Sequence, residues 1–92
     1  MKVEYIKKDN KLIVKINVEQ PTLDTLYDKI NNDFIMFGKN SFYDFLRFDL
    51  GIIHKVKLYK VDNAITLEIN TLEKYFEKLE KEIDLRFETF YL

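Results

Sequence analysis

The sequence predicts an α+β fold, in which one antiparallel sheet carries two helices packed on one face. Two observations predict it. The segments KKDNKLIVKIN (residues 7–17) and KVDNAITLEIN (60–70) share an Asp-Asn dipeptide and an Ile-Asn ending. Each completes a stretch in which apolar and polar residues alternate, and each precedes a stretch whose apolar residues recur with helical spacing. At 92 residues, the chain has the length of a single domain, 1–92.

The two halves of the chain also align with each other under a shift of 53 positions. Residues 2–39 then pair with 55–92 without a gap, and eleven of the 38 pairs are identical. Chance would give roughly 3 identities in so biased a composition. We therefore predict two pseudo-equivalent ββα(β) repeats in one sheet: repeat A at 2–39 and repeat B at 55–92, joined by a connector at 40–54. Convergence of two amphipathic hairpins is the alternative.

Each half opens with a predicted β-hairpin. Asp and Asn tolerate positive φ, so Asp9-Asn10 and Asp62-Asn63 are suited to two-residue turns. Such turns set the register, and alternation then gathers the apolar side chains on one face of each hairpin. The predicted facing pairs on this apolar side are Val3–Ile16, Tyr5–Val14 and Lys7–Leu12, then Val56–Ile69, Leu58–Leu67 and Lys60–Ile65; on the other side, Glu4 faces Lys15 and Lys57 faces Glu68.

A helix is predicted after each hairpin. Apolar residues follow helical spacing in both halves, at Leu23, Leu26, Tyr27 and Ile30 and then at Leu72, Tyr75, Phe76, Leu79 and Ile83. Pro21 is suited to the opening turn of the first helix, and Asn70 or Thr71 is the predicted cap of the second.

Two further segments are less regular. The tail IDLRFETFYL (83–92) alternates, which predicts a strand, and FIMF (34–37) is its predicted shorter counterpart. The segment NSFYDFLRFDLG (40–51) fits a short helix capped by Asn40 or Ser41, and it fits a strand equally well.

Side chains that support catalysis are scarce. Cysteine is absent, which excludes disulfides, thiolate chemistry and cysteine-bound metals. We expect the single histidine, His54, to pack at the rim of the sheet, and the single serine, Ser41, to cap a local element. Gly38 and Gly51 form no phosphate-binding motif, and the carboxylates show no metal-loop spacing. We therefore expect no enzymatic activity, no cofactor and no metal. The sequence shows neither a signal peptide nor a membrane span, so we expect a cytoplasmic protein with no membrane partner.

The non-core side of the predicted sheet carries the candidate binding residues. Candidates for contact with another protein are Ile6, Ile13 and Tyr59 on the sheet, together with Phe42 and Tyr43 in the connector. Candidates for nucleic-acid binding are Lys8, Lys11, Lys15, Lys55, Lys57 and Tyr59. The net charge of −1 and the ratio of 13 lysines to 2 arginines weaken the nucleic-acid interpretation.

These features predict a non-catalytic protein that acts by occupying the surface of a partner protein. The composition is rich in Lys, Ile and Asn and contains a single Ala, which indicates an AT-rich genome. Small chains of this kind are often encoded by phages and mobile elements, which favours an inhibitor of a host nuclease or defence enzyme, of the anti-CRISPR or immunity-protein type. A nucleic-acid-binding module that uses the lysine face and a structural homodimer are the alternatives.

Overall fold

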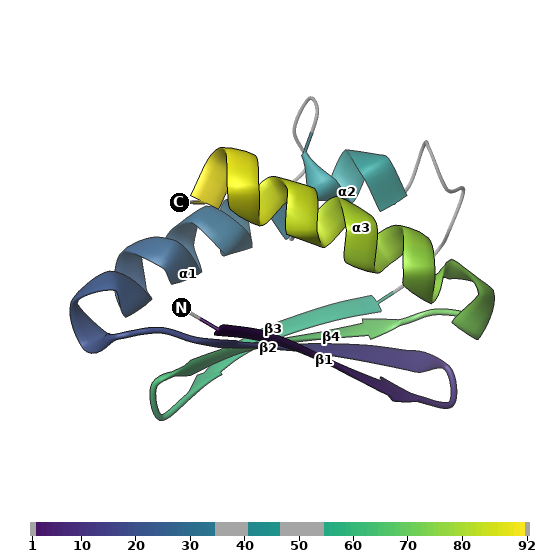
Figure 1. Cartoon of the computed structure of the whole chain (residues 1–92), viewed down its shortest axis with the longest axis horizontal. Coiled ribbons are helices and arrows are strands. Elements are labelled where there is room, and N and C mark those ends of the chain that lie inside the picture. Colours follow the sequence, from purple (N-terminus) through teal and green to yellow (C-terminus); the bar gives the residue numbers. More distant parts are fainter. Residues whose placement is uncertain (1, 35–40, 47–54, 92) are drawn as a thin grey trace.

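The computed structural model describes residues 2–34, 41–46 and 55–91, and it confirms the α+β class (Figure 1). A four-stranded antiparallel sheet carries helices α1 and α3 on one face. In chain order the elements are β1 (Lys2–Lys8), β2 (Lys11–Asn17), α1 (Gln20–Phe34), α2 (Phe42–Asp44), β3 (Lys55–Val61), β4 (Ala64–Asn70), the 3₁₀ turn η2 (Glu73–Tyr75), α3 (Phe76–Arg86) and the π-helical turn η3 (Phe87–Tyr91).

Both hairpins form with the predicted register. Val3 pairs with Ile16 in the first hairpin, and Val56 pairs with Ile69 in the second. The turn residues Asp9 and Asp62 adopt φ values of 22° and 55°. Such positive values are uncommon for residues other than glycine, and Asp accepts them because its short polar side chain can bond locally. The Asp-Asn dipeptides therefore position every cross-strand pair that follows.

The two hairpins meet along their second strands, in the order β1-β2-β4-β3. Val14 of β2 faces Leu67 of β4, and these residues differ by 53 in number. Two backbone hydrogen bonds flank this pairing, from Val18 N–H to the Asn63 carbonyl (3.2 Å) and from Thr71 N–H to the Asn10 carbonyl (3.0 Å). The two donors, Val18 and Thr71, differ by 53 in number, and so do the two acceptors, Asn10 and Asn63.

The core lies between the sheet and the helical layer. Completely buried aliphatic side chains come from β2, β4, α1, α3 and the residues just after α2: Leu12, Val14, Ile16, Ile65, Leu67, Ile69, Ile30, Leu79, Ile83 and Leu46. Burying each contributes about 1.5–3 kcal/mol. Pro21 stands in the first turn of α1, as predicted.

The strand predicted for the tail is wrong. Helix α3 continues to Arg86, and the π-helical turn η3 follows it. The tail fits a helical period as well as an alternating one, because Leu79, Ile83 and Phe87 recur every four residues, and all three are buried. Helical packing against the core therefore overrides the local alternation. In FIMF, Phe34 is the last residue of α1, and residues 35–37 lie outside the described residues.

The cap predicted for the second helix is also wrong. Asn70 is the last residue of β4, and Leu72 occupies the N-cap position of η2 without a side-chain hydrogen bond. In the connector, Ser41 caps the short helix α2 by accepting a hydrogen bond from Asp44 N–H (3.1 Å). The helical alternative therefore holds for the described part of the connector, and His54 lies outside it.

Candidate binding site on the open face of the sheet

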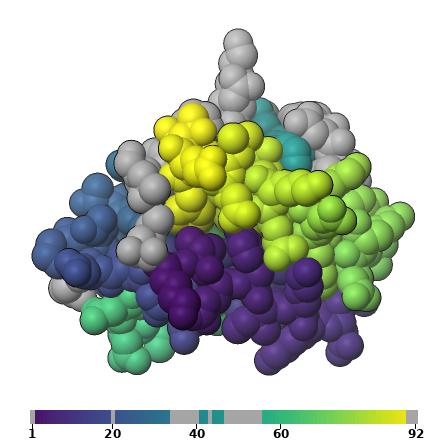
Figure 2. Space-filling model, in the orientation of Figure 1, coloured from purple at the N-terminus to yellow at the C-terminus, as the bar shows by residue number. Residues whose placement is uncertain are grey.

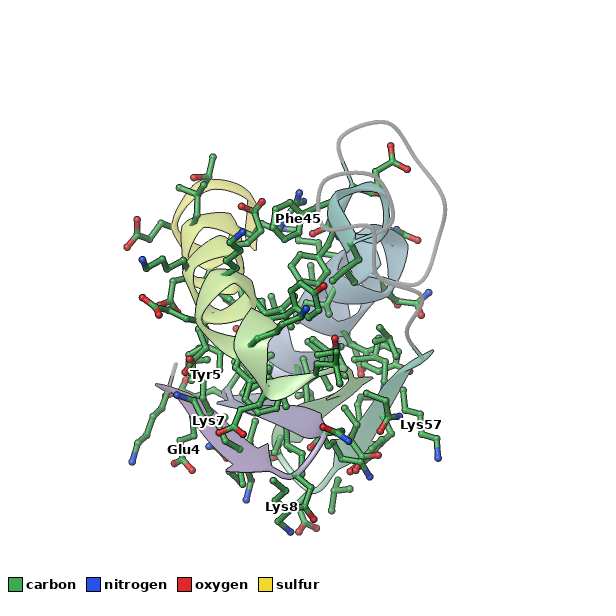
Figure 3. All side chains as sticks on the ribbon, turned by 90° about the vertical axis from the view of Figure 1, so that its right-hand side faces the viewer. Glu4, Tyr5, Lys7, Lys8, Phe45 and Lys57 are labelled. Atoms are coloured by element: carbon green, nitrogen blue, oxygen red, sulfur yellow. The ribbon has the colours of Figure 1, made fainter. Side chains whose placement is uncertain are left out.

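One face of the sheet is covered by the helices, and no described element covers the other (Figure 1). We call this uncovered side the outer face. Tyr5 and Lys7 lie on the side of α3, whereas Glu4 and Lys8 point away from the helices (Figure 3). The pairing of the strands arranges the outer face in four rows: Lys2–Asn17–Ala64–Val61, Glu4–Lys15–Thr66–Tyr59, Ile6–Ile13–Glu68–Lys57 and Lys8–Lys11–Asn70–Lys55. The side chain of Lys55 is not described.

The apolar candidates on the outer face form two groups rather than one patch. Ile6 (38% exposed) faces Ile13 across β1 and β2. Tyr59 (38% exposed) and Val61 (53% exposed) lie on β3, at the opposite corner. The second strands of the two hairpins are neighbours, so β4 separates β3 from the isoleucine pair. The sheet candidates Ile6, Ile13 and Tyr59 therefore lie at two corners of the outer face.

Charge is divided unequally between the two layers. The four strands carry eight lysines and two glutamates. The helical elements α1, η2, α3 and η3 carry nine acidic and five basic residues. Lys7 and Lys60, on the covered face, bridge the layers through ion pairs with Glu80 (3.2 Å) and Asp24 (2.9 Å). The remaining strand lysines make the outer face positive.

The lysines of the outer face differ in their partners. Lys2 pairs with Glu4 (3.4 Å) and Lys11 with Glu68 (3.8 Å). Lys8, Lys15 and Lys57 form no ion pair with any residue in the described part of the chain. Free lysine heads give the outer face its capacity to attract an acidic partner.

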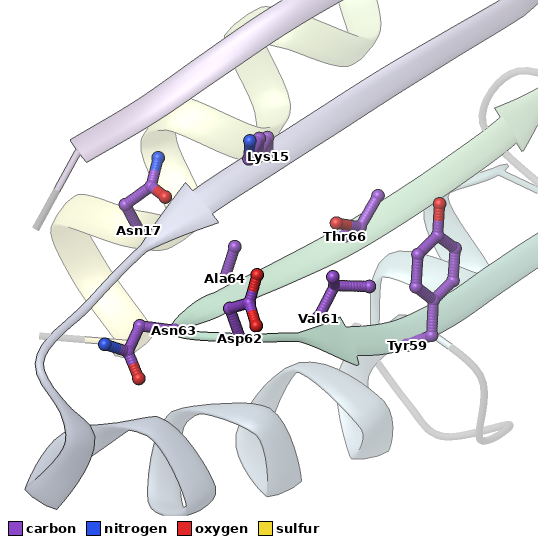
Figure 4. Close-up of a pocket in the computed structure, with 8 residues that line it drawn as sticks. All are labelled: Lys15, Asn17, Tyr59, Val61, Asp62, Asn63, Ala64 and Thr66. Carbon is purple, nitrogen blue, oxygen red and sulfur yellow. The ribbon is translucent and has the colours of Figure 1, made fainter.

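A recess of about 490 Å³ lies at the corner of β2, β4 and β3 (Figure 4). Its floor is formed by Ala64 and Thr66, which are only 5% and 7% exposed. No described helix covers them, and the longer side chains of Lys15, Tyr59 and Val61 stand beside them in the same rows. Tyr59 and Val61 lean from β3 toward β4, and Lys15 rises from β2 on the other side. The residues that line the recess are Lys15, Asn17, Tyr59, Val61, Asp62, Asn63, Ala64 and Thr66.

The structure corrects the role expected for Phe42. Its ring is completely buried in the core, 5.7 Å from the ring of Phe45. A buried ring cannot contact a partner, so Phe42 is not a docking residue. The side chain of Tyr43, the other connector candidate, lies outside the described residues.

Sequence reasoning missed a buried charge cluster in the helical layer. Arg86 Nη1 donates to both carboxylate oxygens of Asp33 (2.7 and 3.0 Å), and Arg86 Nε donates to Glu82 (3.0 Å). The backbone N–H of Phe42 donates to the same Asp33 carboxylate (2.9 Å). Asp33 and Arg86 differ by 53 in number, so the alignment of the two halves had paired them as opposite charges. The cluster joins α1, α2 and α3.

Tyr5 joins the sheet to α3 in a similar way. Its hydroxyl donates to Asp84 Oδ1 (2.5 Å), next to the Lys7–Glu80 ion pair. Figure 2 shows β1 and α3 in contact along this side. Burial raises the pKa of the Tyr5 hydroxyl above its ordinary value, and the hydrogen bond to Asp84 raises it further. Because the Tyr5 hydroxyl stays protonated, it remains a hydrogen-bond donor to Asp84 and links β1 to α3.

The described residues include no group of three or more His, Cys, Asp or Glu side chains placed to hold a metal ion. Within the same residues, no helix has the length and apolar character needed to cross a membrane. No family model, curated protein or solved structure matches this chain. The outer face is therefore the candidate site on geometry alone.

Proposed function

We propose that this chain is a non-catalytic protein-binding domain that occupies a partner's surface with the outer face of its sheet. The partner we propose is a host nuclease or defence enzyme, inhibited by a phage- or mobile-element-encoded chain. The observation that carries the proposal is the exposure of Ile6, Tyr59 and Val61 among lysines on an uncovered face. A sheet face that only meets water is usually polar, and apolar groups with a polar rim are typical of protein interfaces.

Two features favour a protein over a nucleic acid. Ile6 and Val61 are aliphatic, so they offer no ring on which a base could stack, and Tyr59 is the one aromatic residue of the outer face. The four strands contain no arginine, the residue best suited to bidentate phosphate contacts. Lysines with interspersed aliphatic side chains suit an acidic protein surface better.

The outer face also argues against a homodimer formed face to face. Such a dimer would bring Lys8, Lys15 and Lys57 of one copy toward the lysines of the other. Like charges brought together in an interface cost several kcal/mol. A partner of opposite charge is favoured for the same reason.

We also propose that the two halves are pseudo-equivalent ββα units that arose by duplication. Support comes from the shift of 53 positions, which maps residues 20–34 of α1 onto 73–87 in η2, α3 and η3. It also maps buried residues onto buried residues: Leu23 onto Phe76, Leu26 onto Leu79 and Ile30 onto Ile83. On the outer face the shift maps Ile6 onto Tyr59, and both residues are exposed.

The function is tested by expressing the chain in bacteria that carry individual nuclease-based defence systems and measuring phage plating. We expect plating to be restored against one such system. The double variant Ile6→Ser with Lys57→Glu changes two exposed outer-face residues and should abolish the protection. The matched control, Leu85→Ser with Lys78→Glu, changes an exposed apolar residue and a lysine on α3 and should keep it.

Two results would contradict the proposal. If protection survives the outer-face variant and is lost with the helix control, the binding surface lies on the helices. If no nuclease-based system is antagonised, the inhibitor function is wrong. Circular dichroism of each purified variant establishes that the fold is retained.

A further inference from the structure

We propose that the recess at Tyr59, Val61, Ala64 and Thr66 is the anchor site of the outer face, and that it takes a partner segment in which an apolar side chain stands next to carboxylates. This inference rests on the proposed function, because it names the chemistry of the partner at that surface. Its basis is a comparison of the two corners of the outer face.

The two corners have the same pattern of strand pairing and different side chains. Under the shift of 53 positions, Ala64 and Thr66 correspond to Lys11 and Ile13 at the other corner. Lys11 lies across the outer face there, because its amine reaches Glu68 on the neighbouring strand (3.8 Å). Small residues stand on the floor at one corner and large ones at the other, and we attribute the recess to the small side chains of Ala64 and Thr66.

The walls of the recess suit an apolar side chain. Tyr59 and Val61 are exposed large apolar residues in the described part of the chain, and both lean from β3 toward β4 (Figure 4). Ala64 and the methyl group of Thr66 give the floor an apolar surface. A volume of about 490 Å³ leaves room for an aromatic or branched aliphatic side chain. Central pockets filled by one such residue provide much of the binding energy in protein interfaces.

The charge at the recess selects the neighbours of that side chain. Lys15 lines one side, is exposed and forms no ion pair among the described residues. Its equivalent at the other corner, Glu68, pairs with Lys11 instead. Asp62 lies at the turn end of the recess and disfavours a carboxylate there. A carboxylate is therefore favoured beside Lys15, next to an apolar group seated against Tyr59.

The test uses nuclear magnetic resonance of the full chain, labelled with ¹⁵N, at low salt. The probe is a short peptide with the core Glu-Glu-Phe-Glu-Glu. One control peptide replaces each Glu with Gln, and another replaces Phe with Gly. We expect the probe to shift the amide signals of Lys15, Tyr59 and Thr66. Each control should bind at least about tenfold more weakly, because each lacks one of the two contributions.

Two variants locate the binding. Thr66→Ile fills the floor of the recess with the residue found at the equivalent position, and it should weaken probe binding about tenfold. The matched control Ile13→Thr makes the reverse change at the other corner and should leave probe binding unchanged. Both variants place β-branched residues in strands, so the fold should tolerate them.

Several outcomes would overturn the inference. Equal binding of the probe and the Gly control would remove the apolar anchor. Shifts confined to Ile6 and Ile13 would place the site at the other corner. Tighter binding of single-stranded oligo(dT) at the same signals would identify a nucleic-acid site. Absence of any shift would refute the recess as a site.

The failure of this inference is distinguishable from the failure of the proposed function. If Thr66→Ile keeps full protection in the plating assay and the peptide probe does not bind, the recess is not the anchor, and the outer face stays the binding surface. If the probe binds as expected and the chain antagonises no defence system, the recess is retained and the inhibitor function is refuted.

Discussion

Replacement of Asp33 by alanine should remove a large part of the folding stability of this chain. The Asp33 carboxylate accepts hydrogen bonds from Arg86 and from the backbone N–H of Phe42. The side chains of Arg86 and Asp33 are 7% and 15% exposed, so water screens the pair little. Without Asp33, the Arg86 guanidinium stays buried and keeps Glu82 as a partner. The Phe42 N–H loses its hydrogen bond to the Asp33 carboxylate.

The magnitude follows from the burial. Removing one partner of a buried ion pair costs about 3–5 kcal/mol, because an uncompensated charge is left behind. Glu82 still compensates part of that charge, which favours the lower end, about 3 kcal/mol. A domain of 92 residues has a free energy of unfolding of about 5–14 kcal/mol. One substitution should therefore remove between about a fifth and three fifths of the total.

The assay is urea unfolding followed by circular dichroism. With a slope of about 1 kcal/mol per molar urea, the midpoint should fall by about 3 M. The double variant Asp33→Leu with Arg86→Met removes both charges and should recover most of the loss, because an apolar pair replaces a buried ion pair at little cost. A loss below about 1 kcal/mol for Asp33→Ala would refute the reasoning, and so would a double variant as unstable as the single one.

Three further predictions concern single residues. Tyr5 has a raised pKa in the folded chain, so its contribution to stability is complete below about pH 10, the pKa of a free phenol, and decreases above it. Between pH 8 and pH 11, the free energy of unfolding in urea should therefore fall more for the parent chain than for Tyr5→Phe. An equal fall in both proteins would contradict this. Thr71 buries a hydroxyl that has no hydrogen-bond partner among the described residues, so Thr71→Val should raise the free energy of unfolding by up to about 1 kcal/mol, whereas a decrease would reveal a partner. Asp62 has a φ of 55°, which a β-branched residue tolerates poorly and glycine tolerates well. Asp62→Val should therefore lower the free energy of unfolding by about 1–2 kcal/mol, and Asp62→Gly should lower it less. Equal losses for the two variants would show that the turn conformation is not the cause.

Local signals predicted the hairpins well and the helical layer only in part. The Asp-Asn turns and the alternation that follows determine each hairpin register without any distant contact, and the structure confirms every predicted pair. The tail failed because its apolar residues satisfy two periods at once, and packing of Phe87 against the core selected the helical one. The cap at Asn70 failed because β4 extends through that residue.

The candidate site was likewise predicted only in part from local sequence signals. Alternation predicted which residues lie on the outer face, including Ile6, Tyr59 and the lysines. The order of the strands decides which of them are neighbours, and no local pattern contains that order. The recess also needed the pairing of β2 with β4, because it places Lys15 next to Thr66. The alignment of the two halves places Asp33 and Arg86 at equivalent positions. It does not predict that they touch, because their contact depends on how α1 and α3 pack together.

The meeting of the hairpins along β2 and β4 has a consequence for how fast the chain folds. Each hairpin joins residues that are close in sequence, and such units form in about 1–10 μs. The central pairing starts at Asn17 and Ala64, which differ by 47 in number, and this long loop must close before any contact repays the lost entropy. We expect the rate-limiting barrier to lie at this closure, with both hairpin tips already formed.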